Sequence, residues 1–181
     1  MNPFVFLIDI LFQLYATALL IRVLLQWVRA DFYNPVSQFI VKITNPLVMP
    51  LRKIIPGFGG IDVATLLLAF IVLTIKAIVV YQTVDPLPIL VIAIGSTLKL
   101  IINIFLYSVI IQAILSWVNP DPYNPVVGLL NSLTHPILKH FRNLIPPMGG
   151  MDVSSLFAII FLMFVQYSVS YVFAQVFGFS V

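Results

Sequence analysis

The pattern of hydrophobic positions divides the chain into four long apolar runs, separated by two polar stretches and one short connection. A helix needs about 20 predominantly apolar residues to cross a bilayer, and each run reaches that length. We therefore predict four transmembrane helices, at residues 3–28, 62–84, 93–118 and 153–177. The third apolar run already begins at residue 87, so residues 87–92 are either an interfacial lead-in or an N-terminal extension of that helix.

The polar stretch that follows the first span returns ninety residues later without a gap. Residues 27–66 and 117–156 are identical at 17 of 40 positions, and most of these are Trp, Asp, Asn, Pro, Gly or Arg. Chance similarity between apolar segments would match Leu, Ile and Val instead, so we predict a tandem repeat. Repeat one is expected at residues 1–86 and repeat two at residues 87–181. With two spans each, both repeats have the same orientation, related by an axis along the membrane normal.

The two long polar stretches, residues 29–61 and 119–151, are predicted to hold short helices. Each contains an N-cap residue followed by proline at the first helical position, in the pairs Asn34-Pro35 and Asn124-Pro125. A second short helix is expected to begin near Pro46 and near Pro136. Apolar side chains follow one face and basic ones another, and such segments tend to lie in the headgroup plane. The predicted fold class is an all-α membrane protein in which each half consists of a transmembrane span, short interfacial helices and a second transmembrane span.

Composition supports this class and gives an orientation. The chain is 61% hydrophobic and 8% charged, with a mean hydropathy of +1.12, whereas soluble domains carry about 25% charged residues. The N-terminal run is too long for a cleaved signal, so we expect a retained first span. The basic residues of the two long stretches are Arg29, Lys42, Arg52, Lys53, Lys139 and Arg142. Cytoplasmic loops of membrane proteins are enriched in Lys and Arg, which predicts cytoplasmic long loops and both termini outside.

The repeated polar positions have structural explanations. Asp62 and Asp152 form a symmetric carboxylate pair, but Asp between Gly-Gly and an apolar helix is typical of an N-cap, and then Asn should substitute with little loss. The other expected structural positions are Trp27, Asp31, Asn34, Pro35, Arg52, Gly59, Gly60, Trp117, Asp121, Asn124, Pro125, Arg142, Gly149 and Gly150. The Asp and Gly residues indicate turns and the Trp residues the membrane–water interface.

The sequence offers no catalytic constellation. It has no cysteine and no visible nucleophile–base arrangement. His135 and His140 occur in one repeat only and without a carboxylate partner, which disfavours a metal site. We expect no enzymatic activity, no metal and no cofactor. The net charge of +3 is too small, and too confined to the loops, to predict nucleic-acid binding.

Polar residues inside the spans are the more unusual feature. All four predicted spans place a polar group at a similar depth, in a layer of Asp9, Gln13, Lys76, Lys99, Asn103 and Gln166. A charge in the hydrocarbon costs at least a few kcal/mol unless it is paired, and it suggests function by default. We expect Asp9 to face the bundle interior and to pair with Lys99, Lys76 or both. The alternative is that the two lysines extend to the outer headgroups.

The repeated motifs resemble the YggT family of bacterial inner-membrane proteins, also called YlmG, which has plastid relatives. The resemblance rests on Arg22 to Trp27, Asp31 to Pro35, Thr44-Asn45-Pro46, Pro50 to Pro56, Gly60-Ile61-Asp62 and their counterparts in repeat two. It implies a multi-pass inner-membrane protein associated with osmotic or ionic stress, cell division, cytochrome assembly or nucleoid placement, without a catalytic residue. Repeat two departs from repeat one at Gln112 and Asn143, which replace Arg22 and Lys53.

Two functions follow as expectations. The favoured one is a non-enzymatic inner-membrane protein that organises or assists a membrane assembly through its basic cytoplasmic helices. Its partners would be anionic lipid headgroups and a membrane protein, and the chain could also form a homo-oligomer. The alternative is a small ion-handling or osmotic-stress protein that uses the intramembrane polar layer.

Overall fold

A computed structural model describes residues 2–58, 60–118, 124–144 and 152–178. Within these residues the fold is all helical, and no strand is present apart from one isolated bridge between Phe58 and Ile61. The helices of this described part are α1 (Pro3–Trp27), α2 (Pro35–Arg52), α3 (Val63–Tyr81), α4 (Pro86–Val118), α5 (Pro125–Leu144) and α6 (Ser154–Phe177).

Four of these helices are long and apolar enough to cross a membrane, namely α1, α3, α4 and α6. Their bounds agree with the four predicted spans to within a few residues, except at the start of α4. Residues 87–92 belong to α4 and extend it at its N-terminus, which decides between the two alternatives for that segment. At 33 residues and about 1.5 Å per residue, α4 exceeds the roughly 30 Å of a hydrocarbon core. The arrangement is that of an integral membrane protein.

Local signals set where the helices begin. Asn2 caps α1 by accepting a hydrogen bond from the Phe4 backbone amide, at 3.0 Å, and Pro3 occupies the first helical turn. The same device starts α2 and α5, where Asn34 and Asn124 accept from amides two residues ahead, each at 2.9 Å. The predicted N-caps of these two helices are therefore confirmed.

The prediction of a second short helix near Pro46 and Pro136 is wrong. Each polar stretch holds one continuous helix, with Pro46 and Pro50 inside α2 and Pro136 inside α5. Proline removes one backbone hydrogen bond and bends a helix, but it ends the helix only where nothing else holds the following turns. Here Val48 and Leu138, each two residues beyond a proline, are completely buried against neighbouring helices. Burial of these side chains thus stabilises the helical turns that follow each proline.

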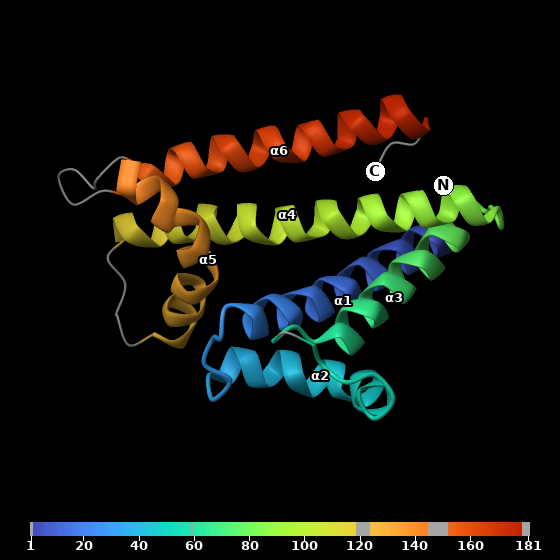
Figure 1. The fold of residues 1–181 in the computed structure, drawn as a ribbon, viewed down its shortest axis with the longest axis horizontal. Helices are drawn as coiled ribbons and strands as arrows, with labels where there is room; N and C mark the ends of the chain where they lie inside the picture. Colours follow the sequence, from blue (N-terminus) through green and yellow to red (C-terminus); the bar gives the residue numbers. More distant parts are fainter. Residues whose placement is uncertain (1, 59, 119–123, 145–151, 179–181) are drawn as a thin grey trace.

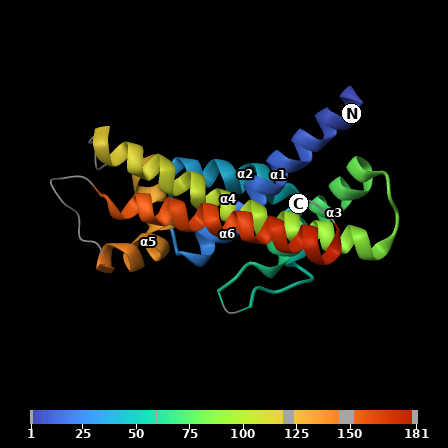
Figure 2. The same ribbon diagram turned by 90° about the horizontal axis from the view of Figure 1, so that it is seen from above.

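The helices pack in two groups (Figures 1 and 2). In one group α1 packs against α3 with α2 beside them, and in the other α4 packs against α6 with α5 across their end. Completely buried alanines, such as Ala16, Ala69 and Ala158, lie in these contacts. Small residues let helix backbones approach closely, which matters in lipid because burial of apolar surface is not a driving force there.

Each group has its own core. The larger core joins Leu19 and Leu20 of α1, Val48 of α2 and Leu73 of α3, and α4 and α5 each reach into it. The smaller core joins α4, α5 and α6 around Val109, Leu138 and Leu162. The start of α1 and the end of α6 lie at one end of the molecule, whereas α5 and the turn between α1 and α2 lie toward the other (Figure 1).

Candidate functional site

The three helices of the first half meet at a buried polar cluster, which we call the junction network. It consists of Arg22, Thr44, Asn45, Arg52, Asp62 and Thr65. Asp62 is the N-cap of α3, and its carboxylate accepts from the Thr65 backbone amide at 3.2 Å and also from the Thr65 hydroxyl. The predicted capping role of Asp62 is therefore confirmed.

Asp62 does more than cap a helix. Its Oδ2 accepts hydrogen bonds from Nε of Arg52, at 3.1 Å, and from Nη2 of the same side chain. The guanidinium of Arg22 lies 3.9 Å from the same oxygen. Only 2% of Asp62 and 3% of Arg22 are exposed. A charge this deeply buried is stable only when it is paired and hydrogen-bonded, so each group depends on the other.

Arg22 connects α1 to α2 as well. Its Nη1 donates to the Thr44 hydroxyl at 2.6 Å and to Asn45 Oδ1 at 2.9 Å. We did not place Arg22, Thr44 or Asn45 among the candidate site residues. A signal was present, because an arginine within an apolar run marks a site that needs a partner.

The electrostatics of Asp62 follow from these contacts. Burial alone would raise the pKa of this carboxyl, because it disfavours the charged form. The hydrogen bonds from Arg52 and Thr65 outweigh burial and hold the pKa below its usual range. Asp62 is therefore a carboxylate at neutral pH, which fits a role in fixing two arginines better than a role in proton transfer.

The second half repeats this arrangement with less burial. Arg142 donates to Asp152 Oδ2 through Nε at 2.8 Å and through Nη2 at 2.5 Å. Burial raises the pKa of Asp152, but hydrogen bonds from Ser154 and Arg142 more than offset it, and the net shift is downward. Asp152 does not hold the predicted cap position, because Val153 is the N-cap of α6 and makes no side-chain cap hydrogen bond.

Gln112 stands where the first half has Arg22, and it makes a different contact. Its Nε2 donates to Asn131 Oδ1 at 2.7 Å, whereas its own Oε1 is buried without a hydrogen-bond partner among the described residues. The second half therefore lacks the buried arginine that connects three helices in the first.

A second polar cluster lies within the spans. Lys76 of α3 lies 3.0 Å from Asp9 Oδ1 and donates to Gln13 Oε1 at 2.5 Å, both on α1. The expected pairing of Asp9 with a lysine is thus seen, with Lys76 as the partner. Of the other predicted layer positions, Lys99 is half-buried on α4 and Gln166 is half-buried on α6.

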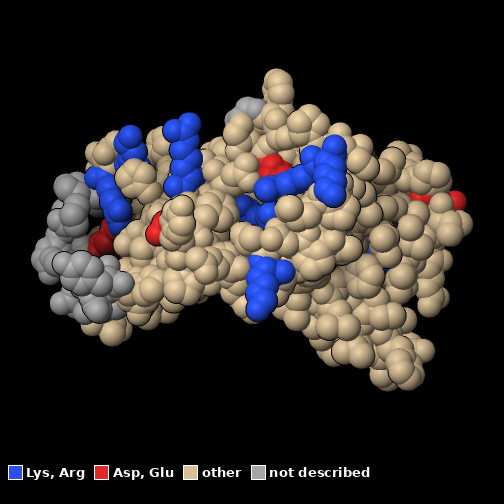
Figure 3. All heavy atoms as spheres, turned by 90° about the horizontal axis from the view of Figure 1, so that it is seen from below, with Lys and Arg blue, Asp and Glu red and all other residues tan. Residues whose placement is uncertain are grey.

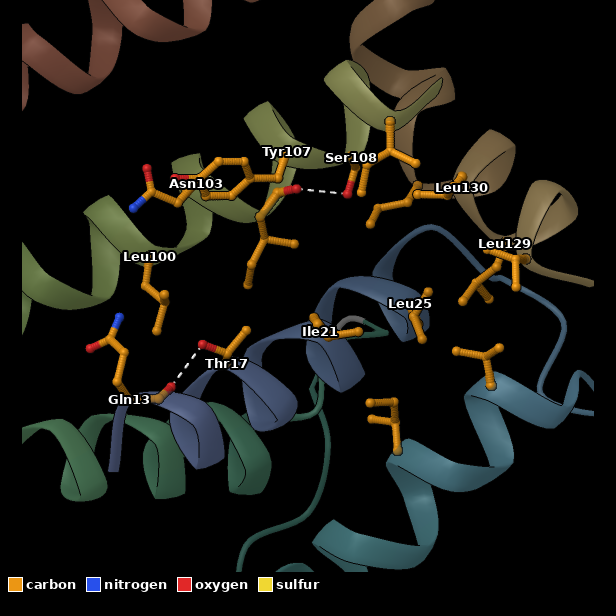
Figure 4. A pocket seen from close by; sticks show the side chains of 16 residues that line it. Gln13, Thr17, Ile21, Leu25, Leu100, Asn103, Tyr107, Ser108, Leu129 and Leu130 are labelled. Atoms are coloured by element: carbon orange, nitrogen blue, oxygen red, sulfur yellow. Dashed lines mark hydrogen bonds between the residues drawn. The ribbon is translucent and has the colours of Figure 1, made fainter. Parts of the chain in front are cut away.

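A cavity of about 550 Å³ lies between the two halves (Figure 4). α1 and α2 form one wall, and α4 and α5 form the other. Many lining positions are ninety residues apart and face the cavity from opposite halves. These pairs are Gln13 with Asn103, Thr17 with Tyr107, Ile21 with Ile111, Val36 with Val126, and Ile40 with Leu130.

The remaining predicted positions lie near the ends of the helices. Asp31 accepts from the Tyr33 amide at 2.8 Å in the expected turn, and Asn34 Nδ2 donates to the Pro125 carbonyl at 2.5 Å, which joins the starts of α2 and α5. Trp27 is half exposed and meets the Phe105 ring edge-on at 6.4 Å. Gly60 has a φ of +83°, a conformation that favours glycine. Outside the described residues lie Gly59, Asp121, Gly149, Gly150 and the Trp117 side chain.

Comparison with known proteins places the chain in a family. The CCB3/YggT family model matches residues 1–83 and, a second time, residues 91–173. The chain belongs to the CCB3/YggT family. The resemblance derived from the repeated motifs is thereby confirmed.

Two relatives span most of the chain, and a third matches a third of it. It is 41% identical to YggT of Escherichia coli K12 over 171 residues, which cover 94% of this chain and 90% of that protein. A Pseudomonas aeruginosa protein is 42% identical over 164 residues, 87% of this chain and 83% of its own length. The ycf19 protein of Porphyra purpurea is 43% identical over 61 residues, 33% of this chain and 64% of that protein. None of these three names states an activity. No solved structure matches the chain significantly.

Proposed function

We propose that this chain is a non-enzymatic integral protein of the bacterial inner membrane that organises or assists a membrane assembly through the basic side of α2 and α5. The observation that carries this proposal is where the basic side chains gather. Lys and Arg collect over the part of the molecule that holds α2 and α5, whereas the end with the chain termini shows few of them (Figure 3).

The outward side of α2 combines charge with apolar surface. Lys42 and Lys53 are exposed, and Phe39, Leu47 and Met49 each expose half or more of their surface. A surface groove of about 660 Å³ runs between the two lysines past Asn45, Pro46, Met49, Pro50 and Ile54. A basic helix with an exposed apolar side suits the boundary between headgroups and acyl chains. Its partners would be anionic headgroups and an acidic, partly apolar segment of a membrane protein.

We infer that the halves are tandem repeats related by an axis along the membrane normal. The family model matches the chain twice in succession, and positions ninety residues apart face each other across the cavity. Lys and Arg in the long loops favour the cytoplasm for α2 and α5, which would leave both termini outside.

The test compares a variant without the positive charges of three lysines with a variant that keeps them. One variant replaces Lys42, Lys53 and Lys139 by Gln, and the matched control replaces the same residues by Arg. In-cell crosslinking followed by purification of the full chain should recover the same membrane protein with wild type and with the Arg control, and lose it with the Gln variant. Recovery of that protein by the Gln variant would contradict the proposal.

The Asp9–Gln13–Lys76 cluster favours the alternative function, ion handling, including a response to osmotic stress. An acid and a base that pair inside a span are the arrangement from which ion and proton pathways are built. The purified chain in sealed vesicles would then carry an ion flux that Asp9→Asn abolishes. Absence of flux in wild type would dismiss this alternative.

A further inference from the structure

The cavity between the halves has the size and lining of a small-molecule site. Its volume of about 550 Å³ falls within the 300–1,000 Å³ that ligand pockets occupy. Most lining side chains are aliphatic, and a few polar ones are placed among them. Such a lining suits a largely apolar ligand that is fixed by a small number of hydrogen bonds.

The polar groups gather at one end of the cavity. Gln13 uses its Oε1 to accept from Lys76, which leaves its NH₂ group for the cavity. Asn103 lies opposite, and Figure 4 shows the amide nitrogens of the two side chains pointing toward each other. The Tyr107 hydroxyl lies at the same end of the cavity (Figure 4). Two walls therefore offer hydrogen-bond donors to whatever lies between them.

This polar end is incomplete. Asn103 Oδ1 is buried and has no hydrogen-bond partner among the described residues. A buried amide oxygen without a partner costs free energy that a hydrogen-bond donor would recover. A rotation of the Asn103 amide exchanges its oxygen and nitrogen, so the same residue can offer a donor or an acceptor to a ligand.

Depth and charge restrict the ligand further. Gln13 lies ten residues after the start of α1, about 15 Å along the helix and near the centre of a 30 Å hydrocarbon layer. No Asp, Glu, Lys or Arg is among the described residues that line the cavity, and Lys76 is already paired with Asp9. A charged phospholipid head or a bare ion would be desolvated there without a counter-charge. The ligand must be neutral.

We propose that this cavity binds a quinone-type lipid, a neutral ring with two opposed carbonyl oxygens and an apolar chain. The carbonyls accept from the Gln13 and Asn103 amides on opposite walls, and Tyr107 supplies a further donor. The chain lies along the aliphatic walls toward Leu25 and Val126, at the end where α2 and α5 begin. Opposed acceptors match opposed donors, which a diacylglycerol, with its oxygens on one short backbone, does not. This proposal does not depend on the basic surface of α2 and α5.

Native mass spectrometry of the purified full chain in detergent tests it. Decylubiquinone serves as the probe and dioctanoylglycerol as the neutral lipid control. Wild type should retain decylubiquinone at least tenfold better than dioctanoylglycerol. Asn103→Leu keeps the branched shape of the side chain and removes the amide donor that faces Gln13, so it should fold and retain decylubiquinone about tenfold less.

A matched tyrosine pair separates the cavity from the rest of the surface. Tyr107→Phe removes a hydroxyl in the cavity and should weaken retention several-fold. Tyr107 is itself 60% exposed, so the control is chosen by position: Tyr167→Phe removes a hydroxyl on α6, none of whose described residues lines the cavity, and should leave retention unchanged. Thermal unfolding midpoints verify folding, and if Asn103→Leu unfolds early the tyrosine pair decides. Equal retention of both lipids by wild type, or equal loss in both tyrosine variants, would overturn the proposal.

Discussion

Replacing Asp62 by Asn tests whether the junction network is held by charge or only by helix capping. Asn caps a helix as well as Asp does, so the bond to the Thr65 amide can persist. The substitution removes the negative charge that lies between Arg22 and Arg52. Arg22 has only 4% of its side chain exposed, so water cannot replace that charge. A pure cap would tolerate this change, as the sequence suggested, whereas the geometry predicts a large loss.

The magnitude follows from burial. Removing one partner of a buried ion pair typically costs about 3–5 kcal/mol, because the other charge is left uncompensated. Arg22 keeps its bonds to Thr44 and Asn45, and Arg52 has 38% of its side chain exposed and can turn to solvent. We therefore expect the lower limit, about 3 kcal/mol, in the free energy of unfolding.

The matched control is Asp152→Asn. Its partner Arg142 has 37% of its side chain exposed, and Gln112 replaces the second arginine, so the expected cost is about 1 kcal/mol or less. Unfolding of both variants in mixed micelles, followed by circular dichroism, measures the difference. Adding Arg22→Leu to Asp62→Asn should recover part of the loss, because it removes the stranded charge. Equal costs for the two Asn variants would refute the reasoning.

Three further predictions follow from the same structure. The fold lowers the pKa of Asp62, so the stability that its carboxylate contributes is complete above about pH 4 and is lost as the pH falls through the pKa of the folded state. Wild type should therefore lose more stability than Asp62→Asn in this pH range, as measured by unfolding across pH 2–6. Asp9→Leu and Lys76→Leu should be non-additive by about 1 kcal/mol in a double-mutant cycle, and strict additivity would show that the 3.0 Å pair contributes nothing. Single cysteines placed at positions 42 and 139 of this cysteine-free chain should react only with membrane-permeant reagents in intact cells, and external labelling would reverse the topology.

Features of the fold that depend on local chemistry could be predicted from the sequence. The apolar runs have the length of spans, and the Asn-Pro pairs mark the starts of α2 and α5 with side-chain acceptors that the structure confirms. The continuation of α2 past Pro46 could not be predicted, because it depends on burial of Val48 by other helices. The same holds for Arg22, whose partners Thr44 and Asn45 are 22 and 23 residues away. No spacing rule connects residues that meet only after α1 and α2 have packed.

The cavity was inaccessible to sequence reasoning for a related reason. The pairing of Gln13 with Asn103 in sequence was visible, since they are ninety residues apart. That they face each other depends on how the two helix groups pack together, and the contacts of Lys76 with Gln13 and Asp9 depend on how α3 packs against α1. The pairing of Asp9 with a lysine could be predicted, but the sequence did not distinguish Lys76, the partner in the structure, from Lys99.

Positions ninety residues apart line opposite walls of the cavity, and this has a consequence for relatives of half the length. The ycf19 match covers 64% of that protein but 33% of this chain, so that protein is about half as long. A chain of that size has room for one such wall, and an isologous dimer would supply the second from another copy. In such a dimer both walls must mutate together. When both walls belong to one polypeptide each can diverge, as Gln13 and Asn103 differ, and as Thr17 and Tyr107 differ.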